Sequence, residues 1–235
     1  MDTRVPEIRK HLKKKLDPFR YEHTLGVEFT CTALAMRYGC DLDKAELSGL
    51  LHDCAKRYDN PTMLKKCRER GIAVTAQEEQ DPSLLHAKLG AWMAKEKYGI
   101  DDEEILSAIR CHTTGKPNMT LLDKILYVAD YIEPRRYKAD RLPEMRKLAF
   151  LDLDRACLEI MDSILSYLES TGCSIDPMTE AACGSMRQVV NVKMLNQTKI
   201  EKKEEQTLES VKRNGKAGSC GSGREKRRRY QGHRH

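Results

Sequence analysis

The amino-acid sequence predicts an all-α protein: a helical bundle followed by a basic tail. Apolar residues recur every three or four positions through most of residues 1–186, which is the spacing of one face of a helix. Residues that start and end helices separate these segments, as Asp17-Pro18 and Gly39 do around the second one. No segment shows the strict alternation of apolar and polar residues that marks a half-buried strand.

The expected helices follow in order along the chain. The first covers residues 6–16, where apolar residues lie four positions apart. The second begins after Asp17, a capping residue followed by a first-turn proline, and runs to residue 38. Glycine or proline ends several of the later segments. These further helices are expected over residues 43–56, 60–70, 83–98, 101–112, 120–132 and 152–168.

The composition indicates a cytoplasmic protein. Hydrophobic residues make up 40% of the 235 residues, and no apolar run approaches the roughly 20 residues that a membrane span needs. Residues 1–6 lack the apolar segment of a signal peptide. The nine cysteines form no Cys-x-x-Cys pair, so we expect free thiols that are mostly buried among apolar side chains.

The charge is divided between a body of residues 1–186 and a tail of residues 187–235. The tail holds 14 Lys and Arg against 5 Asp and Glu, which leaves 28 basic and 31 acidic residues in the body. Few apolar residues occur in the tail, so we expect disorder with a transient helix near residues 189–208. The cluster Arg224–Arg229 predicts contact with RNA or another polyanion, and a solubilising extension is the alternative.

Potential ligands of a metal ion occur in five separate helical segments of the body. Imidazole nitrogen and carboxylate oxygen suit divalent transition metals and leave room for water on the ion. Structural sites prefer closed shells rich in thiolate, so this set favours a reaction centre. A single buried histidine is more often a hydrogen-bonded core residue, and the prediction therefore rests on the whole set: His23, His52, Asp53, His86, His112 and Asp130.

The adjacent pair His52-Asp53 restricts the geometry of such a site. Neighbouring residues on a helix point about 100° apart. One ion can accept both side chains only where the helix ends or at its edge. His11 is assigned to an exposed, lysine-rich face with no role in the site.

The order of these residues resembles that of the HD-domain phosphohydrolases, which are all-helical metal enzymes. The resemblance extends, over residues 1–186, to the YqeK family of symmetrical bis(5′-nucleosyl)-tetraphosphatases. Five motifs carry it: Arg20-Tyr21-x-His23-Thr24-Leu25-Gly26-Val27, Leu50-Leu51-His52-Asp53-x-Ala55-Lys56, Leu85-His86-Ala87-x-x-Gly90, Ile109-Arg110-x-His112-Thr113-Thr114-Gly115 and Ala129-Asp130-Tyr131-Ile132-Glu133-Pro134-x-Arg136.

This resemblance implies an acid-anhydride hydrolase that cuts diadenosine tetraphosphate into two ADP. The expected reaction is in-line attack of metal-bound hydroxide on a β-phosphorus. The metal would be iron, with manganese as the alternative, and its ligands would be His23, His52, Asp53 and Asp130. Asp53, Lys56, His86 and His112 would carry catalysis, with a protonated histidine among the groups that neutralise charge. Phosphate or nucleoside would be held by Arg20, Lys56, His86, His112, Thr113 and Arg136.

Two other readings of the body remain open at this point. One is another HD-type hydrolase, acting on deoxynucleotides or nucleotide alarmones, and the other is a non-catalytic helical module that binds nucleic acid. Cys54 and Cys111 depart from the family pattern, where the first position is usually aliphatic and the second aromatic or polar. Because both are spacers beside ligands, we expect them to affect packing or oxidation more than chemistry. A homodimer is a further expectation.

Overall fold

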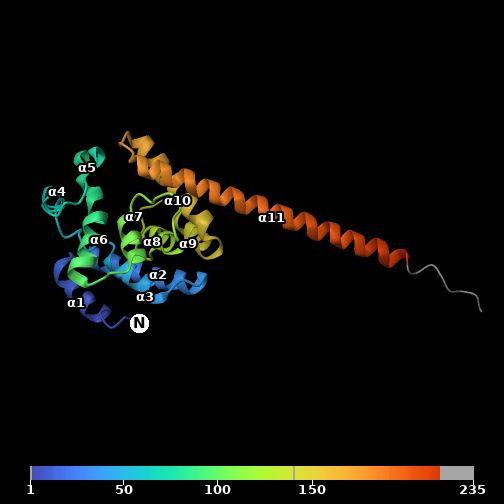
Figure 1. Ribbon diagram of the computed structural model, residues 1–235, viewed down its shortest axis with the longest axis horizontal. Helices are drawn as coiled ribbons and strands as arrows, with labels where there is room; N and C mark the ends of the chain where they lie inside the picture. Colours follow the sequence, from blue (N-terminus) through green and yellow to red (C-terminus); the bar gives the residue numbers. More distant parts are fainter. Residues whose placement is uncertain (1, 140, 218–235) are drawn as a thin grey trace, which may run out of the picture. The chain divides into compact units, whose positions relative to one another are not determined.

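The computed structural model describes residues 2–139 and 141–217, and all its regular elements are helices (Figure 1). Eleven α-helices and one 3₁₀ turn occur in this part of the chain. In order they are α1 (Val5–Lys15), α2 (Pro18–Tyr38), α3 (Leu42–Leu51), α4 (Asn60–Glu69), α5 (Ala76–Gln80), η1 (Pro82–Leu84), α6 (Leu85–Tyr98), α7 (Glu103–Cys111), α8 (Leu121–Ile132), α9 (Leu142–Leu151), α10 (Leu153–Thr171) and α11 (Pro177–Ala217). The predicted all-α class is confirmed.

Local signals explain why the expected helices begin and end where they do. The Asp17 carboxylate accepts a hydrogen bond from the backbone N–H of Arg20, and Gly39 ends α2 in the left-handed conformation. Thr120 and Asp123 form a reciprocal capping box at the start of α8. Among the helices predicted in residues 1–186, the largest difference in a boundary is at α3, which ends at Leu51, five residues before the expected end. The His52-Asp53 pair therefore lies in the turn that follows the helix.

Three elements were not expected from the sequence. The short helix α5 and the turn η1 precede α6, and α9 lies between α8 and α10. Each is short or weakly amphipathic, so periodicity gave little signal. Capping residues were the available indication, since Thr75 and Glu78 form a capping box around α5.

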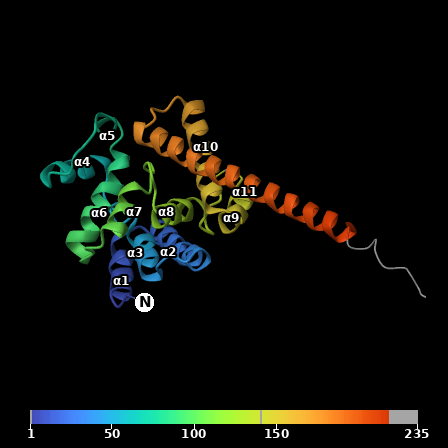
Figure 2. The ribbon, with the colours of Figure 1, turned by 45° about the vertical axis from the view of Figure 1, so that its right-hand side comes forward.

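Helix α8 forms the centre of the core. Its contacts reach α2, α3, α7, α9 and α10 (Figure 2). Most of its side chains are buried. Helices α2 and α3 pack closely because Gly49 lies against α2: a Cβ at Gly49 would be 2.7 Å from Glu28 Cα. This central group of helices carries most of the predicted ligands.

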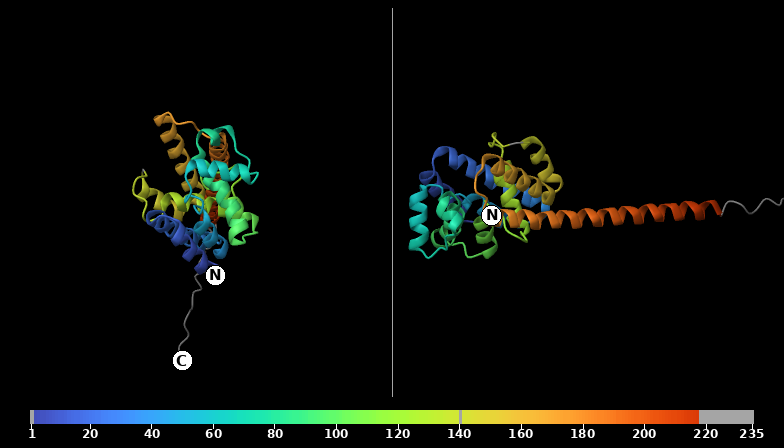
Figure 3. Two further views of the ribbon diagram at one scale, coloured as in Figure 1. Left: turned by 90° about the vertical axis from the view of Figure 1, so that its left-hand side faces the viewer. Right: turned by 90° about the horizontal axis from the view of Figure 1, so that it is seen from above.

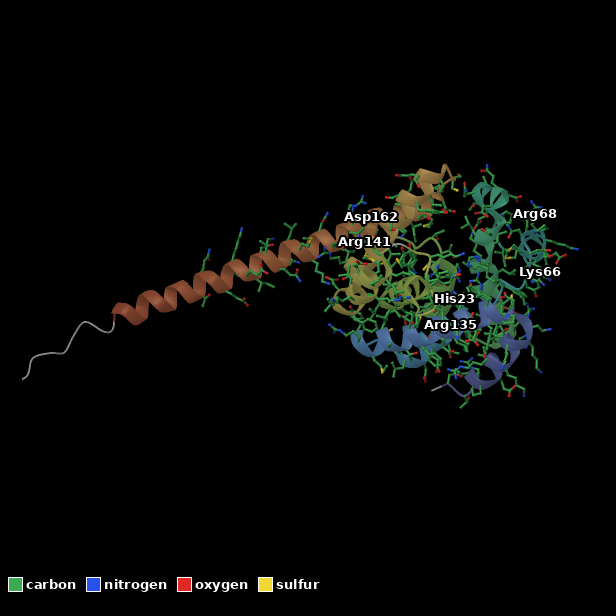
Figure 4. The ribbon with its side chains drawn as sticks, turned by 180° about the vertical axis from the view of Figure 1, so that it is seen from behind. His23, Lys66, Arg68, Arg135, Arg141 and Asp162 are labelled. Carbon is green, nitrogen blue, oxygen red and sulfur yellow. The ribbon has the colours of Figure 1, made fainter. Side chains whose placement is uncertain are left out.

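Helices α4, α5 and α6 lie on one side of the body, linked through η1 (Figure 3). On α4, Arg68 forms an ion pair with Glu79 of α5 at 2.6 Å (Figure 4). On α10, Asp162 pairs with Arg187 of α11 at 2.5 Å. No described helix combines the length and apolarity that crossing a membrane requires.

The described chain divides into two compact units, with the boundary between Val190 and Asn191. Helix α11 covers the segment where a transient helix was predicted and continues to Ala217, beyond the predicted end. The basic cluster Arg224–Arg229 lies outside the described residues. Of the eight described cysteines, all are free and six are buried, as expected, whereas Cys40 is half-buried and Cys173 is exposed.

Candidate metal centre

Five segments bring the six predicted ligands into one buried cluster. His23 lies in the second turn of α2, and His86 lies in the first turn of α6. The pair His52-Asp53 directly follows α3, and His112 directly follows α7. Asp130 lies near the end of α8, where its side chain keeps 24% of its surface exposed. The His52-Asp53 pair therefore lies past the end of a helix, which is one of the positions where a single ion could accept both side chains.

The four imidazoles form a row through the protein interior. Successive ring centroids are 5.4 Å apart for His23 and His52, 5.1 Å for His52 and His112, and 4.9 Å for His112 and His86. Asp130 lies beside the first ring, with its Oδ1 3.1 Å from His23 Nε2. Asp53 lies beside the others, with oxygens 3.4 Å from the Nε2 atoms of both His52 and His86.

The outer nitrogen of every ring is held by an oxygen. The Nδ1 atom of His52 contacts the Gly49 carbonyl at 2.7 Å, and that of His112 contacts the Ile109 carbonyl at 2.8 Å. The Nδ1 atom of His86 contacts the Ser83 carbonyl at 2.5 Å. A carbonyl oxygen can only accept, so each Nδ1 carries the proton. The Nε2 lone pairs then face the centre of the cluster, as in metal-binding histidines.

Two of these inward nitrogens meet the requirement for a metal ligand. The Nε2 atoms of His23 and His52 are buried and have no hydrogen-bond partner among the described residues. A buried polar atom without a partner is costly in free energy, and an ion would satisfy both atoms. The donor atoms form two groups in which all lie within 4.8 Å of one another: His23, His52 and Asp130, and His52, Asp53 and His112. The residues present therefore fit a divalent cation.

The electrostatics of the cluster keep its carboxylates ionised. Burial raises the pKa of Asp53, but the neighbouring imidazoles of His52 and His112 outweigh burial and hold it well below its usual range. Burial likewise opposes ionisation of Asp130, yet contact with His23 and the charges around it hold the pKa of Asp130 far below its usual range. Ionised carboxylates are the form that binds a cation.

Burial has the opposite consequence for His86, because it lowers the pKa of this imidazole to about 3. His86 is therefore neutral at pH 7, in contrast to the protonated form that the sequence analysis considered. The Thr113 hydroxyl lies 3.2 Å from His86 Nε2 and can donate to its lone pair. Lysine and arginine side chains at the cluster supply positive charge that does not depend on His86.

Three cationic side chains predicted to hold phosphate lie at the cluster. Arg20 contacts Asp53 Oδ2 at 2.7 Å, and Arg136 contacts Asp130 Oδ1 at 3.0 Å. Lys56 is half-buried and makes no side-chain hydrogen bond or ion pair among the described residues. Burial lowers the pKa of Lys56, and the charge of Asp53 counteracts this effect. Its ammonium is thus a donor near two carboxylates with no protein partner of its own.

Glu133 orients the histidine at one end of the row. Its Oε1 accepts from His23 Nδ1 at 3.1 Å, and its Oε2 accepts from the backbone N–H of Arg135 at 2.8 Å. Gly26 gives Glu133 this position, since a Cβ at Gly26 would collide with the Glu133 carboxylate. Glu133 is part of the last of the five sequence motifs.

Several groups at the site were not singled out from the sequence. The carbonyl oxygens that anchor the imidazoles carry no side-chain signature. Phe19, Arg135, Tyr137 and Lys138 line a pocket with His23 (Figure 4 labels His23 and Arg135). The basic and aromatic run from residue 135 to 138 was the available signal for this pocket.

Comparison with known proteins identifies the family of the chain. A model of the HD domain matches residues 20–135, a range that contains all six ligands. The chain is 40% identical over 168 residues to the symmetrical bis(5′-nucleosyl)-tetraphosphatase of Bacillus subtilis, covering 72% of this chain and 89% of that protein. The chain belongs to this HD-domain family. The YqeK resemblance of the five motifs is thereby confirmed.

Two further relatives of the family agree. The symmetrical bis(5′-nucleosyl)-tetraphosphatase of Halalkalibacterium halodurans is 41% identical over 175 residues, covering 72% of this chain and 90% of that protein. Among solved structures, a predicted HD superfamily hydrolase involved in NAD metabolism from Clostridium acetobutylicum matches with a TM-score of 0.75 and 38% identity. That match covers 78% of this chain and 96% of the other.

Proposed function

We propose that this protein hydrolyses diadenosine tetraphosphate symmetrically into two ADP with a divalent cation. The observation that carries the proposal is the convergence of four imidazoles and two carboxylates, with two inward Nε2 atoms that make no hydrogen bond among the described residues. Relatives that are 40% and 41% identical over most of their length carry the name of this activity. No comparable support favours a deoxynucleotidase, an alarmone hydrolase or a non-catalytic module.

The ligands divide between a primary set and a group facing the substrate. His23, His52, Asp53 and Asp130 would hold the cation, and His112 adds a nitrogen on the Asp53 side. When bound, the cation supplies a water of lowered pKa and polarises a phosphate oxygen. Iron is the proposed metal and manganese the alternative, because both accept mixed imidazole and carboxylate ligands.

The remaining residues position and neutralise the substrate. A tetraphosphate carries dense negative charge, and Arg20, Arg136 and Lys56 present cations at the edge of the cluster. Lys56 is the donor best placed to stabilise charge on the transferred phosphate, since no described protein group competes for it. His86, held neutral with its Nε2 toward Asp53, Thr113 and His112, would orient the phosphates rather than carry charge.

The reaction products test this proposal directly. Protein loaded with ferrous iron or manganese should convert diadenosine tetraphosphate to ADP alone, as resolved by anion-exchange chromatography. ATP plus AMP would contradict a symmetrical cut, and no turnover with either metal would contradict the enzyme assignment. Lys56→Ala should lower kcat by about 100-fold, as loss of one transition-state donor does, whereas the exposed Lys65→Ala should match the unaltered protein.

Contact of the basic tail with a polyanion and formation of a homodimer are predictions independent of the proposed activity. A polyanion contact would use the cluster Arg224–Arg229, outside the described residues. The location in the cytoplasm likewise stays an expectation from the sequence.

A further inference from the structure

Exposed aromatic rings line a pocket beside the metal centre, and the proposed reaction does not yet explain them. The pocket has a volume of about 480 Å³, and His23 and Glu133 form its floor toward the ligand cluster. We call it the His23 pocket. Phe19 and Tyr137 line it and keep 67% and 69% of their surfaces exposed. A single exposed ring is common on a protein surface, but exposed rings that line the same pocket are a feature of ligand-binding grooves.

The His23 pocket is also strongly cationic. Four of its eight lining residues are Arg or Lys, against the single carboxylate of Glu133. Lys138 Nζ lies 5.6 Å from the centroid of the Tyr137 ring and forms no ion pair among the described residues. Arg135 pairs only with Glu22, at 2.8 Å in an exposed position where an ion pair contributes little. Cations interleaved with aromatic rings are the features that bind a base and its phosphates.

A second pocket reaches the same cluster at another point. It has a volume of about 340 Å³ and is lined by Tyr127, Asp130, His112 and Arg136, with aliphatic side chains of α10. We call it the Tyr127 pocket. The Tyr127 hydroxyl is buried without a hydrogen-bond partner among the described residues. Arg136 lines both pockets, so a single tetraphosphate chain could run from one to the other past the ligands.

This arrangement matches the geometry of the proposed cut. A bond at the midpoint of a dinucleoside tetraphosphate has a nucleoside at equal distance on each side. A site that cuts there needs two base-binding ends with the metal ligands between them. The His23 pocket meets the row of imidazoles at its first ring, and the Tyr127 pocket meets it at His112, two rings along.

We infer that Phe19 and Tyr137 form a stacking platform for one nucleoside of the substrate, with Arg135 and Lys138 beside its phosphates, while the other nucleoside occupies the Tyr127 pocket. This inference rests on the proposed function. The two ends differ in chemistry: the platform is open and stacks any base, whereas the Tyr127 pocket offers a hydroxyl and a fitted aliphatic wall. Phe19 and Tyr137 are binding residues and touch no reacting atom.

Steady-state kinetics of ring-removal variants test the platform. Phe19→Ala and Tyr137→Ala should each raise KM for diadenosine tetraphosphate by about tenfold, as loss of one stacking ring does, and leave kcat unchanged. Tyr137→Trp should restore KM, because indole also stacks. Tyr167→Ala, which removes an equally exposed ring of α10, is the matched control and should leave KM unchanged.

Inorganic tetraphosphate distinguishes base binding from an effect on the metal centre. It has the same chain of four phosphates, with additional charge at its two ends, and no base, so its inhibition constant should not change in Phe19→Ala or Tyr137→Ala. Unchanged KM in both variants overturns the platform. An equal weakening of substrate and of inorganic tetraphosphate also overturns it, because the rings would then act through the phosphate site. Failure of the unaltered protein to form ADP is a separate result, which overturns the proposed function itself.

Discussion

Gly26→Ala tests whether metal binding requires the orientation of His23 by Glu133, because the substitution leaves His23 itself in place. Gly26 is inside α2, and a methyl group there would meet the Glu133 carboxylate, lying 3.2 Å from its Cδ and 3.5 Å from its Cβ. Glu133 is 2% exposed and packed by its backbone hydrogen bonds, so it has little room to yield. The substitution should therefore break the contact between Glu133 Oε1 and His23 Nδ1, which is 3.1 Å long.

The size of the effect follows from that contact. Groups that orient a metal-bound histidine typically change metal affinity or activity by about 10- to 100-fold. A buried His23 N–H left without an acceptor costs about 1–3 kcal/mol of stability. Replacing a helical glycine by alanine stabilises the folded protein by about 0.5–1 kcal/mol. The net expectation is a loss of roughly 0–2.5 kcal/mol of unfolding free energy, together with at least tenfold weaker metal binding.

Calorimetric titration with manganese and urea unfolding without metal measure the two effects separately. Gly184→Ala is the matched control, because a Cβ added to this exposed glycine of α11 would meet no atom within 4 Å and should only stabilise the helix. Glu133→Ala removes the carboxylate that the Gly26→Ala methyl group would meet. Adding Gly26→Ala to Glu133→Ala should therefore change metal affinity little further. Metal affinity in Gly26→Ala equal to that in Gly184→Ala would refute the reasoning.

The further predictions concern the ligands, the thiols and the tail. Asp53→Ala should abolish turnover while far-UV circular dichroism stays unchanged, and retained turnover would remove Asp53 from the centre. Burial raises the pKa of both Cys54 and Cys111 to about 12, so iodoacetamide at pH 8 should label Cys173 but neither of them in the native protein. Because the unfolded chain loses these two thiol protons near pH 9, unfolding free energy should also decline as pH rises from 9 toward 12. Deletion of residues 191–235 should leave kcat within twofold, and a larger loss would give the second unit a role in catalysis.

The helices that position the site were predictable because each has both a buried face and a local cap. Asp17 before Pro18 and the apolar run around Asp130 are signals of this kind. The early end of α3 was harder to predict, because Ala55 and Lys56 are good helix formers. In the structure the chain instead continues through turns, in which the backbone N–H of Lys56 donates to the Asp53 carbonyl. Helix α9 was missed because its Pro143 falls in a first turn that Arg141 enters in the left-handed conformation, without a side-chain cap.

The ligand set was predictable from residue type and order, but its orientation was not. Which nitrogen of His52 or His112 faces inward depends on a backbone carbonyl three residues earlier, and every residue has such a carbonyl. The neutral state of His86 depends on how deeply it is buried, which no motif encodes. The platform of Phe19 and Tyr137 joins the start of α2 to the segment after α8, a proximity that only the fold creates.

Anomalous diffraction from crystals of anaerobically purified protein, at the absorption edge of its metal, tests the central claim most directly. The ligand set predicts an anomalous peak within coordination distance of the Nε2 atoms of His23 and His52 and an oxygen of Asp130, with Asp53 beside it. A second peak between His52 and His112 would indicate two ions. Bound metal elsewhere in the molecule, with none among these side chains, would contradict the assignment of this cluster as the metal centre.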